Sequence, residues 1–466
     1  MTCKLSIQAR MVSVVVLLLA STLTVMAQNP VPFISQPLVP DAVAPSVPGV
    51  TIALTVNGTG FVPTSTVNWN GSPGTTLYVN NSRLMAFITS SDIASPSTAS
   101  ITVVSPEPGG GISNTVFLPI SNPASSVSIA TLTNYSVGEC PQYIATADFR
   151  RDGKLDLVSA NDCSGSVSVL LGNGDGTFRS QTQYTVAGNA QVPIIGDFNR
   201  DGKLDLVVPY YEGMAVLLGQ GDGTFQPAVN YSTSIVPYHG ITADFRGDGK
   251  LDLAFVGAGP DVSILLGNGD GTFGPAVNYT TGGFSTTVAT GDFNHDGKLD
   301  LVTSNYGSNA ASVLLGNGDG TFRYHVDYAT GSNPGGVAVA DLNGDGKLDL
   351  IVANQGSPSV SVLLGNGDGT FRQKVDYPVT AGAVRVDVGD FNQDGKLDLA
   401  VATYGPTVDI LLGNGDGTFQ APLSFPTGND PWNAVSADFN GDGHLDIATG
   451  NFGDGTVSIL LSSNHN

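Results

Sequence analysis

A nine-residue phrase recurs seven times in this chain, and no other feature restricts the possible folds as strongly. In its fourth copy the phrase reads Asp292-Phe-Asn-His-Asp-Gly-Lys-Leu-Asp300. The spacings between successive copies are 49, 47, 48, 49, 49 and 48 residues. One period repeated seven times means that the chain stacks copies of one structural unit. The copies begin at Asp148, Asp197, Asp244, Asp292, Asp341, Asp390 and Asp438.

Each repeat contains the pattern of four short strands. A second phrase, Leu-Gly-Asn-Gly-Asp-Gly-Thr-Phe, follows in the first six repeats, with Gln220 replacing Asn in the second. In the fifth repeat, the two phrases and a Gly/Ser/Pro loop separate strand-like runs at 336–340, 348–353, 359–364 and 371–377. Four antiparallel strands per unit are typical of a β-propeller blade. The sequence therefore predicts an all-β fold with a seven-bladed propeller.

The two phrases, in register with each other, resemble the FG-GAP/VCBS repeat. The resemblance extends over about 128–466. It implies a seven-bladed propeller of the kind found in integrin α-subunits, and many exported bacterial proteins carry the same repeat.

The two ends of the repeat region predict how the ring closes. The seventh repeat ends after three strands and lacks the second phrase. Just before the first repeat, 128–135 matches the fourth-strand pattern that runs up to Tyr328 or Tyr377 in other repeats. We expect this segment to complete the seventh blade, because that pairing removes an exposed sheet edge.

The first 27 residues have the pattern of a secretory signal peptide. Lys4 and Arg10 precede an apolar run at 12–25, and Val25-Met26-Ala27 places small residues before a cleavage point. An uncleaved N-terminal anchor is the alternative interpretation. We expect export to the cell surface, the periplasm or the medium, with no membrane span after cleavage.

The segment 28–120 is expected to form a separate β-sandwich, joined to the propeller at 128–466 by a linker at 121–127. Short alternating runs are separated by Gly, Pro, Asn and Ser clusters. The stretch Asn57-Gly-Thr-Gly-Phe61, followed by a strand that carries Trp69, resembles the IPT/TIG branch of immunoglobulin-like domains. That resemblance implies a spacer or adhesive role.

The acidic residues are concentrated in loops. The chain has 18 Lys and Arg against 40 Asp and Glu, which gives a net charge of -22 and excludes a basic surface for nucleic acid. Of these acids 37 are Asp and 3 are Glu, and Asp favours turns over helices.

The repeated phrase has the oxygen spacing of a calcium-binding loop. Positions 1, 3, 5 and 9 supply side-chain oxygens, position 7 supplies a carbonyl, and Gly at position 6 permits a sharp turn. It is not an EF-hand, because Thr303 occupies position 12 of the fourth copy and strands flank the loop. The predicted ligands in the five complete copies are Asp197, Asn199, Asp201, Asp205, Asp292, Asn294, Asp296, Asp300, Asp341, Asn343, Asp345, Asp349, Asp390, Asn392, Asp394, Asp398, Asp438, Asn440, Asp442 and Asp446.

Two copies depart from this pattern because Arg150 and Arg246 occupy position 3. An arginine there could act as an internal cation, so calcium and arginine remain alternatives for these loops. The total expected is about five to seven Ca²⁺ ions. The Asn-Gly-Asp-Gly turns of the second phrase are interpreted as structural hairpin turns. The candidate ligands in the two departing copies are Asp148, Asp152, Asp156, Asp244, Asp248 and Asp252.

Antiparallel strand order places the Asp-rich loops on one face and the variable loops on the other. Aromatic residues on a rigid scaffold suit a binding surface, since they stack on sugar rings and anchor interfaces. We therefore expect a monomeric, non-catalytic module that binds a glycan or an extracellular protein. The candidate ligand-binding residues are Tyr211, Tyr238, Tyr306, Tyr404 and Trp432.

Two other functions remain open. A polysaccharide lyase or hydrolase with a site in the central funnel would first involve Glu212, Tyr211, His239 and Arg385, but the five His residues have no metal-ligand spacing and no Gly-x-Ser-x-Gly motif occurs. A structural component of an envelope or matrix is the third possibility.

Cys140 and Cys163 are the two cysteines beyond the signal segment. In an exported protein such a pair predicts one disulfide, with two free thiols as the alternative. Each lies at an end of two strands expected to pair in the first blade, so their Cα atoms should be within bonding reach.

Overall fold

The chain folds entirely as strands and turns wherever its structure is described. The computed structural model describes residues 29, 31–34, 38, 43, 51–95, 97–120, 124, 126–233 and 235–462, and every regular element in these ranges is a strand. The all-β prediction is therefore confirmed. The expected signal segment 1–27 and most of the expected linker lie outside the described residues.

The repeats form seven four-stranded antiparallel sheets, which we number in chain order. In the first six sheets the strands pair in the order in which they follow one another. Their bounds are β11 (Pro141–Ala147), β12 (Asp156–Asn161), β13 (Ser166–Leu170) and β14 (Thr182–Thr185); β15 (Ile194–Gly196), β16 (Asp205–Tyr210), β17 (Gly213–Leu217) and β18 (Val229–Ser232); β19 (Pro237–Ala243), β20 (Asp252–Gly257), β21 (Asp261–Leu265) and β22 (Val277–Thr280); β23 (Ser285–Gly291), β24 (Asp300–Asn305), β25 (Ala310–Leu314) and β26 (Val326–Ala329); β27 (Pro334–Ala340), β28 (Asp349–Asn354), β29 (Ser359–Leu363) and β30 (Val375–Pro378); β31 (Ala383–Gly389), β32 (Asp398–Thr403), β33 (Thr407–Leu411) and β34 (Leu423–Pro426).

The seventh sheet joins the two ends of the repeat region. Its strands β35 (Pro431–Ala437), β36 (Asp446–Asn451) and β37 (Thr456–Ser462) are followed at the edge by β10 (Ile129–Ser136). In β10, Tyr135 pairs with Val457, and its hydroxyl accepts a hydrogen bond from the Phe178 amide at 3.2 Å. Tyr184 in β14 makes the same contact with Phe225. The expected pairing of 128–135 with the last repeat is therefore confirmed.

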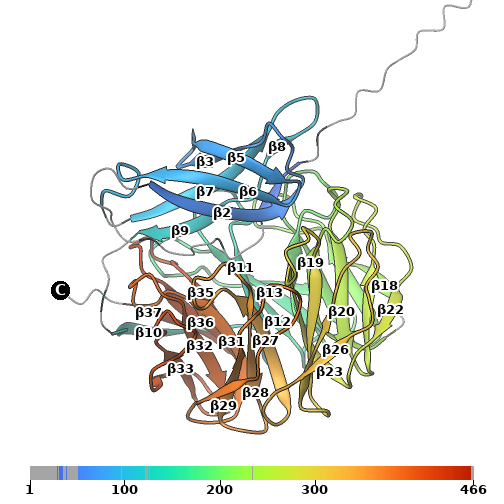
Figure 1. Cartoon of the computed structure of the whole chain (residues 1–466), viewed down its shortest axis with the longest axis vertical. Coiled ribbons are helices and arrows are strands. Elements are labelled where there is room, and N and C mark those ends of the chain that lie inside the picture. Colours follow the sequence, from blue (N-terminus) through green and yellow to red (C-terminus); the bar gives the residue numbers. More distant parts are fainter. Residues whose placement is uncertain are drawn as a thin grey trace, which may run out of the picture.

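Successive sheets are joined by contacts between their first strands. β11 contacts β15, and the series continues through β19, β23, β27, β31 and β35, which in turn contacts β11. All six residues of each second strand, from β12 to β36, are buried, because a neighbouring sheet covers each face. Figure 1 shows these repeated sheets in the lower part of the molecule, an arrangement consistent with a β-propeller.

The expected strands of the fifth repeat are close to the observed ones, with one difference. The fourth strand begins at Val375 and not at Phe371. Phe371 makes only an isolated bridge to Gly365, and its side chain is buried beside Phe293 in the cluster between sheets. The apolar character of Phe371 therefore reflects packing between sheets and not membership of a strand.

The N-terminal unit, residues 29–120 as far as they are described, has two sheets around one core. One sheet pairs β1 (Phe33–Ile34), β2 (Thr51–Thr59), β6 (Arg83–Thr89) and β5 (Thr75–Asn80) in that order. The other contains β4 (Ser72–Pro73), β3 (Thr66–Trp69), β7 (Ser97–Ser105), β8 (Gly111–Ile112) and β9 (Val116–Ile120). Leu54 and Leu84 from the first sheet and Ile101 and Leu118 from the second share one buried cluster. This unit lies against the repeat region (Figure 1).

Candidate cation loops and an aromatic face

Each Asp-rich loop joins the first strand of a sheet to its second, and backbone amides orient its carboxylates. We number the loops with their sheets. In the second loop, Asp197 accepts hydrogen bonds from the amides of Asp201 at 3.0 Å and Gly202 at 2.8 Å. Asp205 accepts from the amides of Phe198 at 3.0 Å and Gly219 at 2.8 Å. These bonds orient the carboxylates of Asp197 and Asp205 toward the same short loop.

The carboxyl groups at position 9 are buried, and burial disfavours their ionised form relative to their protonated form. Asp205, Asp398 and Asp446 are fully buried. Desolvation, and after it repulsion from the other aspartates of the loop, raises the pKa of Asp205 to about 7 and the pKa values of Asp398 and Asp446 to about 8. A nearby cation would favour the ionised form, so these loops are suited to one.

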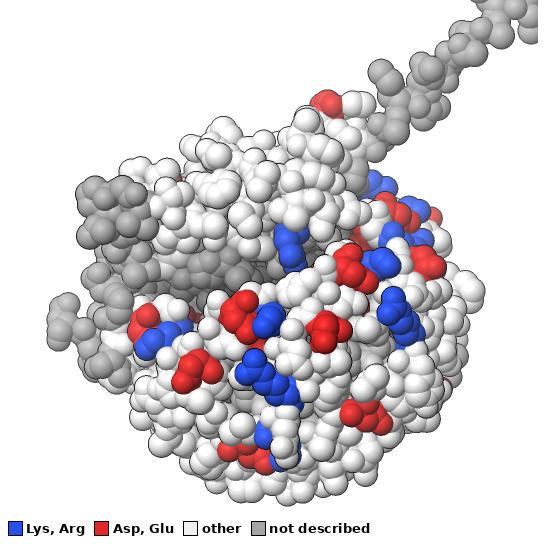
Figure 2. Space-filling view, in the orientation of Figure 1, with Lys and Arg blue, Asp and Glu red and all other residues white. Residues whose placement is uncertain are grey.

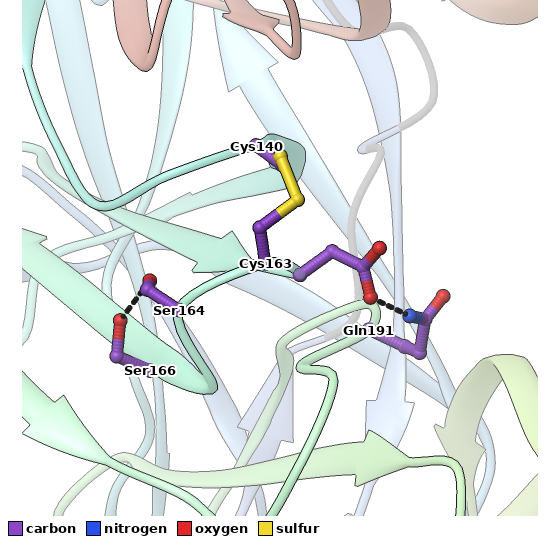
Figure 3. Close-up of a disulfide and its surroundings, with 6 residues drawn as sticks. Cys140, Cys163, Ser164, Ser166 and Gln191 are labelled. Carbon is purple, nitrogen blue, oxygen red and sulfur yellow. Dashed lines mark hydrogen bonds between the residues drawn. A yellow bond between two sulfur atoms is a disulfide. The ribbon is translucent and has the colours of Figure 1, made fainter.

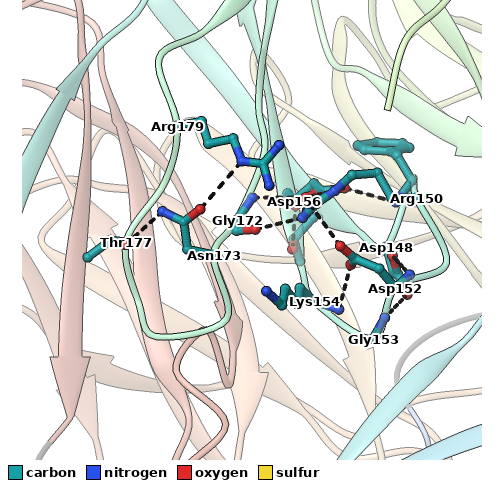
Figure 4. A network of polar contacts seen from close by, with 12 residues as sticks. Asp148, Arg150, Asp152, Gly153, Lys154, Asp156, Gly172, Asn173, Thr177 and Arg179 are labelled. Atoms are coloured by element: carbon teal, nitrogen blue, oxygen red, sulfur yellow. Dashed lines mark hydrogen bonds and ion pairs between the residues drawn. The ribbon is translucent and has the colours of Figure 1, made fainter. Parts of the chain in front are cut away.

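The first and third loops contain that cation as a side chain. Arg150 lies between two carboxylates, with Nη2 2.7 Å from Asp156 Oδ1 and Nη1 2.8 Å from Asp152 Oδ2 (Figure 4). Nη2 also donates to the Gly172 carbonyl at 2.6 Å. Arg246 repeats the arrangement, 2.7 Å from Asp252 and 3.2 Å from Asp248. The arginine at position 3 therefore places a positive charge between positions 5 and 9.

The other five loops have Asn at position 3 in place of this guanidinium. In the second loop Asn199 Oδ1 accepts from the Asp201 amide at 2.9 Å, and Lys203 Nζ lies 3.4 Å from Asp201 on the exposed side. Within the described residues, no three His, Cys, Asp or Glu side chains already converge as a metal cluster. The oxygens of these loops, including amide and carbonyl oxygens, have the hard donor chemistry of a calcium site. In the two Arg loops, the guanidinium places a positive charge between the carboxylates of positions 5 and 9.

The turns of the second phrase have a structural role. Asp175 accepts a hydrogen bond from the Thr177 amide at 3.0 Å, and Asn173 donates to the Thr177 hydroxyl at 2.9 Å. Bonding to Thr177 lowers the pKa of Asp175, which is exposed. The same bonds recur in the other five turns. These contacts agree with the interpretation of the phrase as a hairpin turn.

Aromatic rings form a continuous run on the opposite face. Tyr211 lies between β16 and β17, Tyr238 at the start of β19, Phe284 just before β23, and Tyr306 between β24 and β25. Successive ring centroids in this order are 5.7, 5.8 and 6.3 Å apart, with the rings edge to face. Tyr211, Phe284 and Tyr306 are 41, 37 and 36% exposed.

A second run continues on the same face. Tyr404, 44% exposed, lies 6.2 Å from Trp432, and Trp432 lies 5.4 Å from Phe452. The Tyr404 hydroxyl donates to Gln355 at 3.2 Å. Burial and, after it, the charge of Tyr306 raise the pKa of Tyr404. We call the seven rings the aromatic arc. The five predicted ligand-binding residues all belong to it, and the structure adds Phe284 and Phe452, whose positions in variable loops could have identified them.

Two of the residues considered for a funnel enzyme do not lie in variable loops. His239 and Arg385 are in the first strands β19 and β31, at the register position of Tyr143 in β11. Arg385 is buried and donates to the Tyr143 hydroxyl and the Gly335 carbonyl. Dense surroundings and, after them, the charge of Arg385 lower the pKa of His239 to about 3, although part of its surface still touches solvent. His239 and Arg385 therefore lie on first strands and not in the loops that join one sheet to the next.

A match to a family model covers the Asp-rich loops and the sheets that carry them. The FG-GAP-like repeat model matches residues 148–208, 197–255, 244–303, 300–352, 341–401 and 390–449. These matches together span more than half of the chain. The chain belongs to the FG-GAP-like repeat family. A search of curated proteins finds no match to this sequence.

Solved structures resemble the FG-GAP-like chain at low sequence identity. BBS1N in complex with ARL6DN is 11% identical over 72% of this chain and 98% of that chain, with a TM-score of 0.53. An Agrocybe aegerita lectin that recognises non-reducing terminal N-acetylglucosamine is 21% identical over 77% of this chain and 96% of that one, with a TM-score of 0.46. An auxiliary nutrient binding protein from Bacteroides ovatus is 12% identical over 93% of this chain and 98% of that chain, with a TM-score of 0.43. At these identities, the first match supports the fold alone.

The first FG-GAP-like repeat carries the predicted disulfide. Cys140 and Cys163 are bonded, with their Cα atoms 5.3 Å apart, just before β11 and just after β12 (Figure 3). Pro141 pairs with Asn161 in this sheet, so the two ends lie side by side. The disulfide prediction is confirmed. In the described part of the chain, no helix has the length and apolar character needed to cross a membrane.

Proposed function

We propose that this protein is an exported, calcium-binding recognition module that binds a glycan through the aromatic arc. The arc carries the proposal, because its exposed rings, Tyr211, Phe284, Tyr306 and Tyr404, offer stacking surfaces for sugar rings on one face. An extracellular protein ligand is the alternative occupant, since aromatic anchors also dominate protein interfaces. We propose that the protein acts as a monomer.

Seven blades and an immunoglobulin-like IPT/TIG domain belong to this proposal. The unbroken series of contacts from β11 through β35 and back to β11 supports a ring of seven blades. The pairing of β10 with β37 supports closure of that ring by an N-terminal strand. The two sheets that share one core in the N-terminal unit support a β-sandwich.

Calcium is proposed at the five loops with Asn at position 3. There Asp197, Asn199, Asp201 and Asp205, and their equivalents, would hold it. When bound, the ion supplies positive charge that stabilises the ionised carboxylates and ties the first two strands of a blade together. In the first and third loops, Arg150 and Arg246 support a guanidinium in place of the ion.

A lyase or hydrolase in the central channel remains the second candidate. The proximity of Tyr143, His239 and Arg385 favours it, because these groups can bind anions and move protons. Glu212 lies elsewhere, between β16 and β17 beside Tyr211.

A glycan array probed with the mature chain, with and without chelator, tests the proposed function. We expect binding to a restricted set of glycans, and mass spectrometry of each bound glycan should find it intact. Shortened or unsaturated products would favour the enzyme, and the absence of any bound glycan would contradict glycan recognition.

A further inference from the structure

The N-terminal unit rests on the face that carries the Asp-rich loops. Asn81 donates to the Gly247 carbonyl in the third loop at 2.6 Å. In the segment that follows the unit, the Ala124 amide donates to the Asn392 carbonyl in the sixth loop at 2.6 Å. Phe117 packs against the cluster that contains Phe439, and Phe33 against that of Phe198. In the view of Figure 2 this unit is almost free of charged side chains, whereas the repeat region below carries paired acidic and basic groups. The unit therefore covers part of the Asp-rich face.

The seventh loop makes the most direct contact with this unit. The Thr98 hydroxyl, on β7, donates a hydrogen bond to Oδ2 of Asp438, the position-1 carboxylate. A Cβ atom at Gly443 would lie 3.0 Å from the carbonyl oxygens of Ser97 and Ile120, so the backbones are closely packed here. Gln393 of the sixth loop also donates to the Gly443 carbonyl at 2.7 Å. Among the described residues, no other position-1 aspartate accepts a bond from the N-terminal unit.

Asp438 has no acceptor capacity left in this arrangement. Its Oδ1 accepts from the amides of Gly441 at 2.7 Å and Asp442 at 3.2 Å, and its Oδ2 accepts from the Gly443 amide at 2.8 Å as well as from Thr98. A carboxylate offers about four lone-pair sites, so all are occupied. Asp341, at the same position in the fifth loop, accepts from the amides of Asp345 and Gly346, and within the described part of the chain two of its lone-pair sites are left for a cation.

We propose that the Thr98 hydroxyl and a calcium ion compete for Asp438, so that the N-terminal unit and the cation regulate each other at the seventh loop. This inference rests on the proposed calcium binding. The docked unit raises the calcium concentration needed to fill this loop, and filling it releases Thr98. Because linkage is reciprocal, calcium at this loop must weaken docking by the same factor by which docking weakens calcium binding there. Removing the Thr98 donor should therefore strengthen calcium binding at this loop. The other four Asn-containing loops fill first.

Hydrogen exchange measured on the full chain during a calcium titration tests this coupling loop by loop. In the wild type, we expect the calcium midpoint for protection of 438–446 to be at least tenfold higher than that of 341–349. Protection of β7 should fall over the same range as 438–446 gains protection. In Thr98→Val, the midpoint of 438–446 should move down to that of 341–349, which itself should not change. Thr102→Val, on the same strand, is the matched control and should leave both midpoints in place.

The outcomes separate this inference from the calcium proposal. If 341–349 shows no calcium-dependent protection at millimolar calcium, calcium binding itself is wrong, and the coupling with it. If 341–349 responds to calcium but 438–446 has an equal or lower midpoint in the wild type, competition is overturned while calcium binding stands. The same conclusion follows if Thr98→Val leaves the 438–446 midpoint unchanged or raises it. Melting temperatures of both variants report whether they fold.

Discussion

At the residue scale, the side chain at position 3 decides whether a loop contains its own positive charge. Sequence reasoning identified Arg150 and Arg246 as possible internal cations, because a charge at position 3 is readable from the phrase alone. The contact between Thr98 and Asp438 could not be read in this way, since the two residues are 340 positions apart and belong to different units. The place of Arg385 within strand β31 was not predicted for a related reason, because the register of a first strand depends on the strand beside it.

The position-9 carboxyls predict how stability depends on pH. Their folded pKa values, about 7 for Asp205 and about 8 for Asp398 and Asp446, lie above the ordinary value of 3.8. Between these values the folded form binds more protons than the unfolded form, so stability without cation falls as pH rises from about 4 to about 8.

The measurement is the melting temperature in chelator at pH 5 and pH 8, repeated with millimolar calcium. We expect the chelated protein to melt at a lower temperature at pH 8. Calcium should remove that fall, because the ion binds the deprotonated loops and stabilises the folded state by mass action. A chelated protein that is as stable at pH 8 as at pH 5 would show that these carboxyls do not titrate as described.

Replacing Arg150 by Asn should convert the first loop into a complete calcium loop. The substitution removes the guanidinium that contacts Asp152 and Asp156 and restores the amide found in five other loops. We expect native mass spectrometry at millimolar calcium to count one more ion than in the wild type, whereas Asp296→Ala should count one fewer. An unchanged count in Arg150→Asn would mean that the first loop is unsuited to calcium for another reason.

At the element scale, the strands follow from local pattern and the sheets from repetition. Alternating and apolar runs located the four strands of the fifth repeat, and antiparallel order correctly placed the two cysteines beside each other. Phe371 marks the limit of this reasoning, because an apolar residue next to a turn fits a strand or a cluster between sheets equally well. Only the neighbouring sheet, which contributes Phe293, decides between them.

Removal of the disulfide should destabilise the first sheet. The bond closes a loop with a sequence separation of 23 residues, and a loop of this size is worth about 3 kcal/mol in the chain-entropy model. The variant Cys140→Ser, Cys163→Ser should therefore lose about 2–5 kcal/mol of unfolding free energy, measured by denaturant titration. A loss below about 1 kcal/mol would show that β11 and β12 gain little from the cross-link.

Deletion of 129–136 tests closure of the ring by β10. The deletion exposes the edge of β37 and removes Tyr135, which contacts Phe178 in the first repeat. Unpaired strand edges promote association between chains. We expect aggregation on light scattering and a lower melting temperature, and a monomeric product as stable as the wild type would argue against closure.

At the scale of the whole molecule, the two faces of the repeat region have different chemistry. The Asp-rich face holds the candidate cation loops and the N-terminal unit, while the opposite face carries the aromatic arc. The family, the all-β fold and most arc residues were predictable from the repeats, because a fixed period assigns each loop to a face. The position of the N-terminal unit on the Asp-rich face was not predictable, since the residues with which it contacts that face lie outside the repeats.

The central claim is that the aromatic arc binds the ligand, and the affinity of arc variants for the strongest array glycan tests it most directly. Tyr211→Ala and Tyr404→Ala each remove one exposed ring, from different runs of the arc. Tyr324→Ala is the matched control, because Tyr324 is 82% exposed and lies between β25 and β26, outside the arc. We predict that each arc variant weakens binding about tenfold or more by calorimetry, while the control binds as the wild type does. Wild-type affinity in both arc variants would contradict the account.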